Sequence, residues 1–146
     1  MTPEVVDRIY VDSSAFIALA DAKDSFHQRA KKFAEALPAG AGLFTSDLVL
    51  AETFSNLQYH LGGGPARTFC RSILSGESGV ELAFPTRDDL LSAQRILAKY
   101  HDQKFSLVDA VSFVLMENLG IREAFTFDRH FAVYRPRGKH FRLLPA

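Results

Sequence analysis

The stretch RIYVDSSAFIALA, residues 8–20, contains the two patterns that decide the fold. Its first part, Arg8 to Val11, is a short β-branched and aromatic run that predicts a buried strand. The oxygen-bearing side chains of Asp12, Ser13 and Ser14 follow at once in the position of a helix N-cap, and the apolar residues after them favour a helix. A strand that leads directly into a capped helix is the repeating unit of an α/β fold.

The same alternation continues along the chain. Apolar periodicity predicts helices at 25–37, 47–61, 66–74, 86–100 and 106–119, and strands at 42–45, 80–84, 124–127 and 141–144. Gly62 to Pro65 is expected as a loop between two helices. Parallel neighbouring strands need a crossover, which helices supply. The order therefore predicts an α/β fold, a three-layer α/β/α sandwich with a parallel sheet of four to five strands.

The composition is typical of one globular domain. The chain has 146 residues, 47% of them hydrophobic and 23% charged, with 13 Phe, which allows a substantial core and excludes a disordered or fibrous protein. No internal repeat or low-complexity tract divides the chain. We therefore expect residues 1–146 to form a single domain.

The cysteine count and the apolar runs indicate the compartment. Cys70 is the only cysteine, so an internal disulfide is impossible. The first residues, MTPEVVDRIYVD, lack the basic and long apolar regions of a secretory signal, and no apolar run approaches the roughly 18 residues that a membrane-spanning helix needs. The sequence predicts a cytoplasmic protein without membrane contact.

Four acids stand out by their positions. Asp12 and Asp128 each follow a predicted strand, and the carboxyl ends of parallel strands share one edge of a sheet. Asp109 lies in the first turn of a helix that is apolar nearly all round, where an ionised carboxylate needs a cation or hydrogen-bond donors to replace its water. Glu52 lies on a half-apolar helix stripe, which predicts partial burial. We expect the four side chains to meet in one pocket.

Each acid also fits an ordinary structural role. Asp12 fits a helix N-cap, and Asp109 lies three residues after Ser106, which is the spacing of a capping box. Glu52 fits an exposed acid on a helix, and Asp128 fits a turn residue. The coincidence of two strand-end acids with two helical acids beside apolar surface favours a shared site.

Such a cluster predicts a hard cation. Carboxylate oxygens without cysteine or a well-spaced histidine pair favour Mg²⁺ or Mn²⁺ over zinc, and phosphate chemistry is the usual use of these ions. None of the five histidines forms an HxxxH pair. His130, two residues after Asp128, is expected to face solvent, with contact to a substrate phosphate as the alternative.

The charge balance excludes a global attraction to nucleic acid. Lys and Arg together number 17, as do Asp and Glu, so any such binding must rest on local patches and on a metal. The C-terminal segment 135–142 is one basic patch, and it fits a solvated edge equally well.

At this point the chain resembles the PIN-domain nucleases, and within them the VapC-type toxins of bacterial toxin–antitoxin pairs. The resemblance covers nearly the whole chain and rests on four segments that each hold one of the acids. The segments are IYVDSSAFIALAD with Asp12, SDLVLAETFSNL with Glu52, FSLVDAVSFVLMENLGI with Asp109 and AFTFDRHF with Asp128. The last two are the most specific, and no acidic position departs from the family pattern.

The resemblance implies a doubly wound parallel sheet, one or two divalent ions in an acidic pocket, and RNA as substrate. It also implies a homodimer and, for the toxin branch, a small antitoxin protein whose tail covers the site. Ser13 and Thr126 occupy hydroxyl positions beside the first and fourth acids, where they can orient water or phosphate, although a helix cap and a strand residue explain them equally well.

We therefore predict a metal-dependent endoribonuclease. In this hypothesis Asp12, Asp109 and Asp128 hold Mg²⁺ or Mn²⁺, Glu52 helps to orient the attacking water, and the products carry 5′-phosphate and 3′-hydroxyl ends. Further candidates for substrate contact, chosen because they flank the third and fourth acids, are Gln103, Lys104 and Arg129.

Other functional classes fit less well. An aspartyl-nucleophile phosphatase needs a second Asp two residues after the first, where this chain has Ser14. The P-loop and dinucleotide-binding glycine motifs are absent from the sequence. The remaining alternatives are a stand-alone RNA-processing nuclease and a PIN-fold binding module without turnover.

Overall fold

The computed structural model describes residues 7–146. The first six residues, which the expectations for the N-terminus and for a domain spanning 1–146 include, lie outside this range. The elements follow in the order β1 (Arg8–Val11), α1 (Ser13–Ala20), α2 (His27–Glu35), β2 (Gly42–Ser46), α3 (Asp47–Leu61), α4 (Gly63–Leu74), β3 (Val80–Ala83), α5 (Arg87–Lys99), α6 (Leu107–Leu119), β4 (Glu123–Phe125), α7 (His130–Val133), a 3-10 turn η1 (Pro136–Gly138) and β5 (Arg142–Leu144).

The five strands form one parallel sheet in the order β3-β2-β1-β4-β5. In the central strand β1, Tyr10 pairs with Phe44 of β2 on one side and with Ala124 of β4 on the other. The chain builds the sheet outward from β1 in one direction and then returns to build it in the other. The predicted parallel, doubly wound sheet is confirmed, and within residues 7–146 it has five strands. Ligand sites of such sheets lie where the direction reverses, here beside the ends of β1 and β4.

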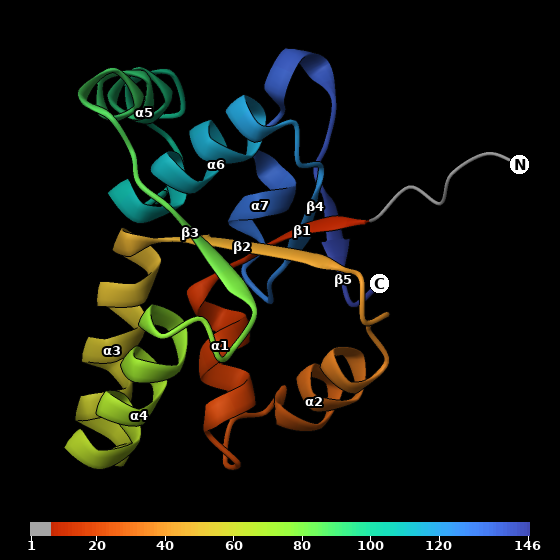
Figure 1. Cartoon of the computed structure of the whole chain (residues 1–146). Coiled ribbons are helices and arrows are strands. Elements are labelled where there is room, and N and C mark those ends of the chain that lie inside the picture. Colours follow the sequence, from red (N-terminus) through yellow and green to blue (C-terminus); the bar gives the residue numbers. More distant parts are fainter. Residues whose placement is uncertain (1–6) are drawn as a thin grey trace, which may run out of the picture.

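Helices cover both faces of the sheet, which confirms the three layers (Figure 1). The first four helices, α1 to α4, lie on one face, and α5, α6 and α7 lie on the other. This arrangement explains why Ile9, Tyr10 and Val11 of the central strand are all buried, because a strand covered on both faces has no solvent side.

Aromatic side chains fill the core between α6 and the C-terminal elements. Phe113 of α6 is fully buried, stacks on Tyr134 with ring centroids 4.7 Å apart, and meets Phe105 and Phe131 edge to face. Such rings bury much apolar area and prefer these geometries. The cluster fixes the loop before α6 and the segment after β4 relative to each other, and both of these border the candidate site.

Two parts of the element prediction are wrong. The predicted loop from Gly62 to Pro65 is mostly helical, since α4 begins at Gly63, and proline is tolerated in a first turn because its missing N–H has no partner there. The short helix α7 was not predicted at all. Its four residues are too few to produce a period, and a turn at Asp128 starts it.

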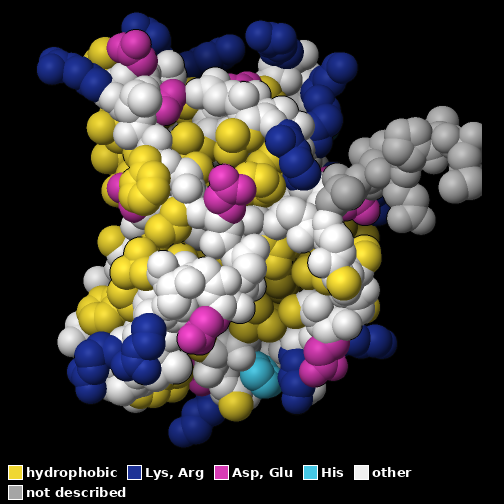
Figure 2. Space-filling view, in the orientation of Figure 1, with side chains coloured by type: hydrophobic (Ala, Val, Ile, Leu, Met, Phe, Trp, Pro, Cys, Tyr) yellow, Lys and Arg dark blue, Asp and Glu magenta, His cyan; other side chains and the backbone are white. Residues whose placement is uncertain are grey.

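The surface agrees with the charge analysis. All five basic side chains of the C-terminal patch, Arg135, Arg137, Lys139, His140 and Arg142, are exposed. Figure 2 shows Lys and Arg side chains along the upper edge, over α5 and the loop between α7 and β5. Within residues 7–146, none of the helices has the length and the apolar character to cross a bilayer.

Candidate functional site

Asp12 lies where β1 ends and α1 begins. It is the N-cap of α1, and the residue is 2% exposed. The atom Oδ2 accepts hydrogen bonds from the Ser14 hydroxyl at 2.8 Å and from the Thr126 hydroxyl at 3.0 Å. The capping role and the position at the strand end are therefore both correct, because one side chain fulfils both.

Burial makes the charge on Asp12 costly. It raises the pKa of this carboxyl to about 6, although hydrogen bonds from Ser14 and Thr126 act in the opposite direction and the negative charge of Asp109 adds to the rise. A carboxylate that is short of water and close to another acid gains more from a cation than a surface carboxylate does.

Asp109 closes the capping box of α6. Its Oδ2 accepts the backbone N–H of Ser106 at 3.0 Å, and its own N–H donates to the Ser106 hydroxyl at 3.0 Å. The residue is 6% exposed, and burial raises the pKa of its carboxyl, with a further rise from the charge of Asp128. The predicted capping box is confirmed, as is the predicted burial beside apolar surface.

Asp128 sits in the turn after β4 and brings His130 to Asp109. Its Oδ1 accepts the backbone N–H of His130 at 2.9 Å, and its own N–H donates to the Thr126 hydroxyl at 3.0 Å. The imidazole Nδ1 of His130 lies 2.9 Å from Asp109 Oδ2 and 3.4 Å from Asp128 Oδ1. The turn thus joins the third and fourth acids, which are 19 residues apart in the sequence.

Glu52 lies on the outer side of the site. Its side chain is exposed, so the predicted partial burial is wrong; the apolar stripe of α3 passes through Val49, Thr53 and Leu57, on either side of it. A hydrogen bond of 2.5 Å from the Ser13 hydroxyl to Glu52 Oε1 ties it to the start of α1. Glu52 therefore neighbours Asp12 through Ser13 and does not join the buried acids.

The structure links the four acids in one chain of contacts but does not place them equally close. Among residues 7–146, Asp109, Asp128 and His130 form a group in which each offers a ligand atom within 4.8 Å of the others. Asp12 stands outside this group and connects to Asp128 through the Thr126 hydroxyl, which donates to Asp12 and accepts from Asp128. The closest three ligand candidates thus differ from the predicted three, with His130 in the place of Asp12.

His130 is the residue that the sequence analysis misjudged. Its side chain is only 32% exposed, and it contacts two acids instead of pointing into solvent. The available signal was its spacing, because a residue two positions after an Asp in a turn donates its N–H to that side chain and stays beside it. Only the fold places Asp109 there as well.

The donor set fits a divalent ion. Octahedral ions such as Mg²⁺ bind ligands at about 2.0–2.1 Å, so neighbouring ligand atoms lie about 3 Å apart. The distances of 2.9 Å and 3.4 Å from His130 Nδ1 to the two carboxylates are close to this spacing. Burial of Asp12 and Asp109 supplies the reason for a cation, and these acids supply hard oxygen ligands.

The candidates for substrate contact differ in burial. Thr126 and Ser13 are buried and bonded to Asp12 and Glu52 respectively, so their hydroxyls position acids in this structure. Lys104 and Arg129 are exposed and Gln103 is half-buried. Their contact with substrate stays a prediction.

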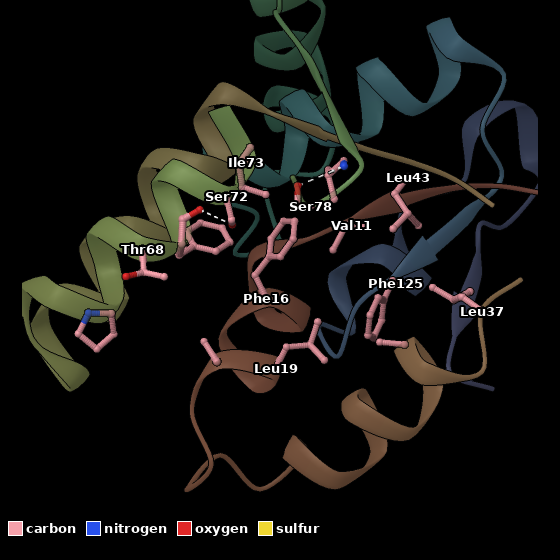
Figure 3. A pocket seen from close by; sticks show the side chains of 15 residues that line it. Val11, Phe16, Leu19, Leu37, Leu43, Thr68, Ser72, Ile73, Ser78 and Phe125 are labelled. Atoms are coloured by element: carbon pink, nitrogen blue, oxygen red, sulfur yellow. Dashed lines mark hydrogen bonds between the residues drawn. The ribbon is translucent and has the colours of Figure 1, made fainter. Parts of the chain in front are cut away.

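A mainly apolar cavity lies elsewhere. A cavity of about 650 Å³ opens between α1, α2 and α4, and Figure 3 shows Phe16, Leu19 and Ile73 among the side chains that line it. None of the four acids lines this cavity, and its walls are mainly apolar. The acids therefore lie outside this cavity, in the polar site beside the ends of β1 and β4.

Known proteins resemble this chain both in sequence and in fold. The 23S rRNA-specific endonuclease VapC20 of Mycobacterium tuberculosis is 33% identical over 124 residues, which cover 85% of this chain and 92% of that protein. Its crystal structure, described as a sarcin-ricin loop cleaving toxin, matches with a TM-score of 0.79 at 32% identity, covering 86% of this chain and 93% of that chain.

More distant matches follow. Ribonuclease VapC26 of Mycobacterium tuberculosis is 29% identical over 137 residues, covering 92% of this chain and 98% of that protein. A toxin–antitoxin complex from Klebsiella pneumoniae shares the fold, with a TM-score of 0.59 at 16% identity, covering 83% of this chain and 87% of that chain. The family model of the PIN domain matches residues 9–135. With Asp12 and Asp128 after the ends of β1 and β4 in a doubly wound parallel sheet, the chain belongs to the PIN domain family.

Proposed function

We propose that this chain is an endoribonuclease that hydrolyses RNA phosphodiester bonds with the help of Mg²⁺ or Mn²⁺, and that it acts as the toxin of a toxin–antitoxin pair. The proposal treats residues 1–146 as one catalytic domain that works in the cytoplasm. The proposal rests on one observation: Asp109, Asp128 and His130 lie together, near buried Asp12. They lie beside β1 and β4, where the order of strand addition reverses. The relatives named as a ribonuclease and an rRNA endonuclease support the choice of RNA as substrate.

The four acids have different roles in the proposed mechanism, according to their positions. Asp109 and Asp128 present carboxylate oxygens to the ion, with Asp12 as the third acid of the set, held in place by Ser14 and Thr126. Glu52, exposed and bonded to Ser13, is positioned to accept a hydrogen bond from the attacking water at the outer edge of the site.

The reaction is a hydrolysis in which water supplies the new oxygen. A bound divalent ion lowers the pKa of water, neutralises phosphate charge and stabilises the leaving oxygen. The water oxygen forms a bond to phosphorus, the bond from phosphorus to the 3′-oxygen breaks, and the 3′-oxygen takes up a proton. The products carry 5′-phosphate and 3′-hydroxyl ends, because the RNA 2′-hydroxyl takes no part.

The test is cleavage of a defined RNA by the purified full chain with Mg²⁺, with Mn²⁺, or with EDTA. We expect cleavage with either ion, none with EDTA, and products that a 5′-phosphate-dependent exonuclease degrades. Cyclic phosphate ends contradict the mechanism. Tight RNA binding without any cleavage supports the alternative of a binding module that has lost turnover.

The antitoxin and the homodimer are further parts of the proposal. Relatives of the VapC type and the fold shared with a toxin–antitoxin complex support an antitoxin partner. The test is the adjacent gene: we expect a short reading frame for a DNA-binding protein whose co-expression blocks RNA cleavage. Its absence favours a stand-alone RNA-processing nuclease. Light scattering of the purified chain tests the dimer, for which we expect twice the 16.2 kDa of one chain.

A further inference from the structure

His130 lies between two carboxylates that the proposed function assigns to the ion. Its Nδ1 atom is 2.9 Å from Asp109 Oδ2 and 3.4 Å from Asp128 Oδ1. Both neighbours are hydrogen-bond acceptors when ionised, so a nitrogen in this position either carries a proton or shares a cation with them. The ring nitrogen therefore has the surroundings of a ligand.

The position of the ring is built into the fold. The backbone N–H of His130 donates to Asp128 Oδ1 at 2.9 Å, which fixes the first residue of α7 against the turn. The buried ring of Phe105 meets the imidazole edge to face, with centroids 5.2 Å apart, and Phe105 in turn packs against Phe113 in the core. A side chain held from both its backbone and its ring loses little freedom when it binds a ligand.

The spacing fits direct binding. Adjacent ligand atoms around an octahedral ion are about 3 Å apart, as the two distances from Nδ1 are. A single ion can thus take the place of the proton between His130 Nδ1 and Asp109 Oδ2, and the side chains need to move only slightly to bind it. No other histidine of residues 7–146 belongs to a group of potential ligands.

We propose that His130 Nδ1 is a direct ligand of the catalytic ion together with Asp109 and Asp128, and that this nitrogen makes the site prefer Mn²⁺ to Mg²⁺. The inference deepens the proposed function and rests on it for the presence of an ion. Mg²⁺ strongly favours oxygen ligands, whereas first-row transition ions also accept imidazole, so a mixed nitrogen and oxygen set discriminates between the two.

The competing role for His130 is to orient Asp109 through a hydrogen bond without touching the ion. Affinity alone does not separate the two roles, because losing a group that only orients a metal ligand also costs about 10- to 100-fold in affinity. A spectroscopic signal from nitrogen bound to manganese does separate them, since it reports a direct bond and does not depend on turnover.

The experiment is pulsed electron paramagnetic resonance of Mn²⁺ bound to the full chain. We expect a ¹⁴N coupling of bound imidazole in the natural protein, its replacement by a ¹⁵N coupling when histidine is ¹⁵N-labelled, and its loss in His130→Gln. The control is His60→Gln, which changes an exposed histidine of α3 and should leave the coupling intact. We also expect the Mn²⁺ dissociation constant to rise at least about tenfold in His130→Gln and that for Mg²⁺ to rise less than about threefold.

The outcomes separate the inference from the function on which it rests. Bound Mn²⁺ without a nitrogen coupling overturns the role of His130 as a ligand and leaves the metal-dependent nuclease standing. A coupling that persists in His130→Gln overturns it in the same way. A failure of Mn²⁺ to bind at all overturns both. The labelling arm uses the natural sequence, so it decides the question even if His130→Gln does not fold.

Discussion

Asp109 has two roles in one side chain, and they can be separated by experiment. It closes the capping box of α6 with Ser106 and faces His130 in the acid group. Asp109→Asn keeps an oxygen that accepts the Ser106 N–H but loses the negative charge. We expect RNA cleavage to fall by more than about 100-fold, beyond the loss of a group that only orients a ligand. Stability should be unchanged or higher, because the buried charge is gone. Cleavage assays and urea unfolding measure the two effects.

The chain contains its own control for this variant. Asp89 closes the capping box of α5 with Thr86 in the same way, away from the acid group. Asp89→Asn should therefore keep full cleavage activity. Full activity in Asp109→Asn removes Asp109 from the mechanism, and equal losses in both variants show that helix capping alone accounts for the effect.

The raised pKa of Asp12 predicts that the stability of the metal-free protein depends on pH. Its folded pKa of about 6 lies above its ordinary value of 3.8, so the folded state holds the proton more tightly than the unfolded state. The stabilisation is complete below pH 3.8 and is lost as the pH rises through 6. The difference between the two pKa values corresponds to about 3 kcal/mol.

Urea unfolding in EDTA between pH 4 and pH 8 measures this effect. We expect the free energy of unfolding of the natural protein, relative to Asp12→Asn, to decline across this range, because the amide keeps the N-cap and the hydrogen bonds but does not titrate. A constant difference between the two proteins over the whole range contradicts the assignment.

Individual residues show what the sequence can and cannot predict about the site. The burial of Asp109 followed from its place on an apolar helix, and the place of Asp12 at the sheet edge followed from the strand before it. The exposure of Glu52 and the contacts of His130 did not, because both depend on which faces meet after folding. The caps predicted for Asp12 and Asp109 and the turn predicted for Asp128 were also correct. These roles are compatible with a metal site, because a cap or a turn holds a carboxylate in place and leaves some of its oxygen lone pairs free.

At the scale of elements, Ser14 fastens the first turn of α1 to the segment after β4. Its hydroxyl donates to Asp12 Oδ2 at 2.8 Å and accepts the Phe127 N–H at 2.9 Å. Ser14→Ala leaves both partners without this bond. We expect the free energy of unfolding to fall by about 1–3 kcal/mol, the range for buried polar groups left unpaired.

The same substitution should also weaken metal binding, because Asp12 loses a donor that orients it. Isothermal titration with Mn²⁺ measures this effect, and Ser25→Ala, at an exposed position before α2, is the control that should change neither quantity. A Ser14→Ala protein with natural stability and affinity shows that the contact between α1 and the β4 segment is dispensable.

The element prediction succeeded where the pattern was long and the ends were marked. The range of α3 was predicted as observed, the start of α5 was predicted within one residue, and the capped start of α6 was found from Ser106. The prediction failed for the start of α4. Gly63 and Pro65 are typical loop residues, and the helical conformation there depends on packing against α3, which the local sequence does not show. Short elements such as α7 carry too few residues for a period.

At the scale of the whole molecule, metal binding should be visible as stability. An ion that binds the folded chain but not the unfolded chain stabilises it by about 2.7 kcal/mol at a concentration of 100 times its dissociation constant. For a chain of this size we expect the melting temperature to rise by roughly 5–10 °C with Mn²⁺ and to return with EDTA.

The size of this rise should depend on pH. Asp12 and Asp109 hold protons more tightly than ordinary carboxyls, and a proton competes with the ion for the same oxygen atoms. We expect a smaller rise at pH 5 than at pH 8, measured by thermal unfolding with a fixed excess of Mn²⁺. The variant Asp89→Asn should behave like the natural protein, and a rise that is equal at both pH values contradicts the competition.

The wide separation of the site residues along the chain has a consequence for synthesis. Position 12 is made well before its partners at 126, 128 and 130. The site therefore cannot assemble until both segments have been made, and a fragment that ends before Thr126 lacks Asp128 and His130. For the proposed toxin, this order delays activity until the segment from 126 to 130 has left the ribosome.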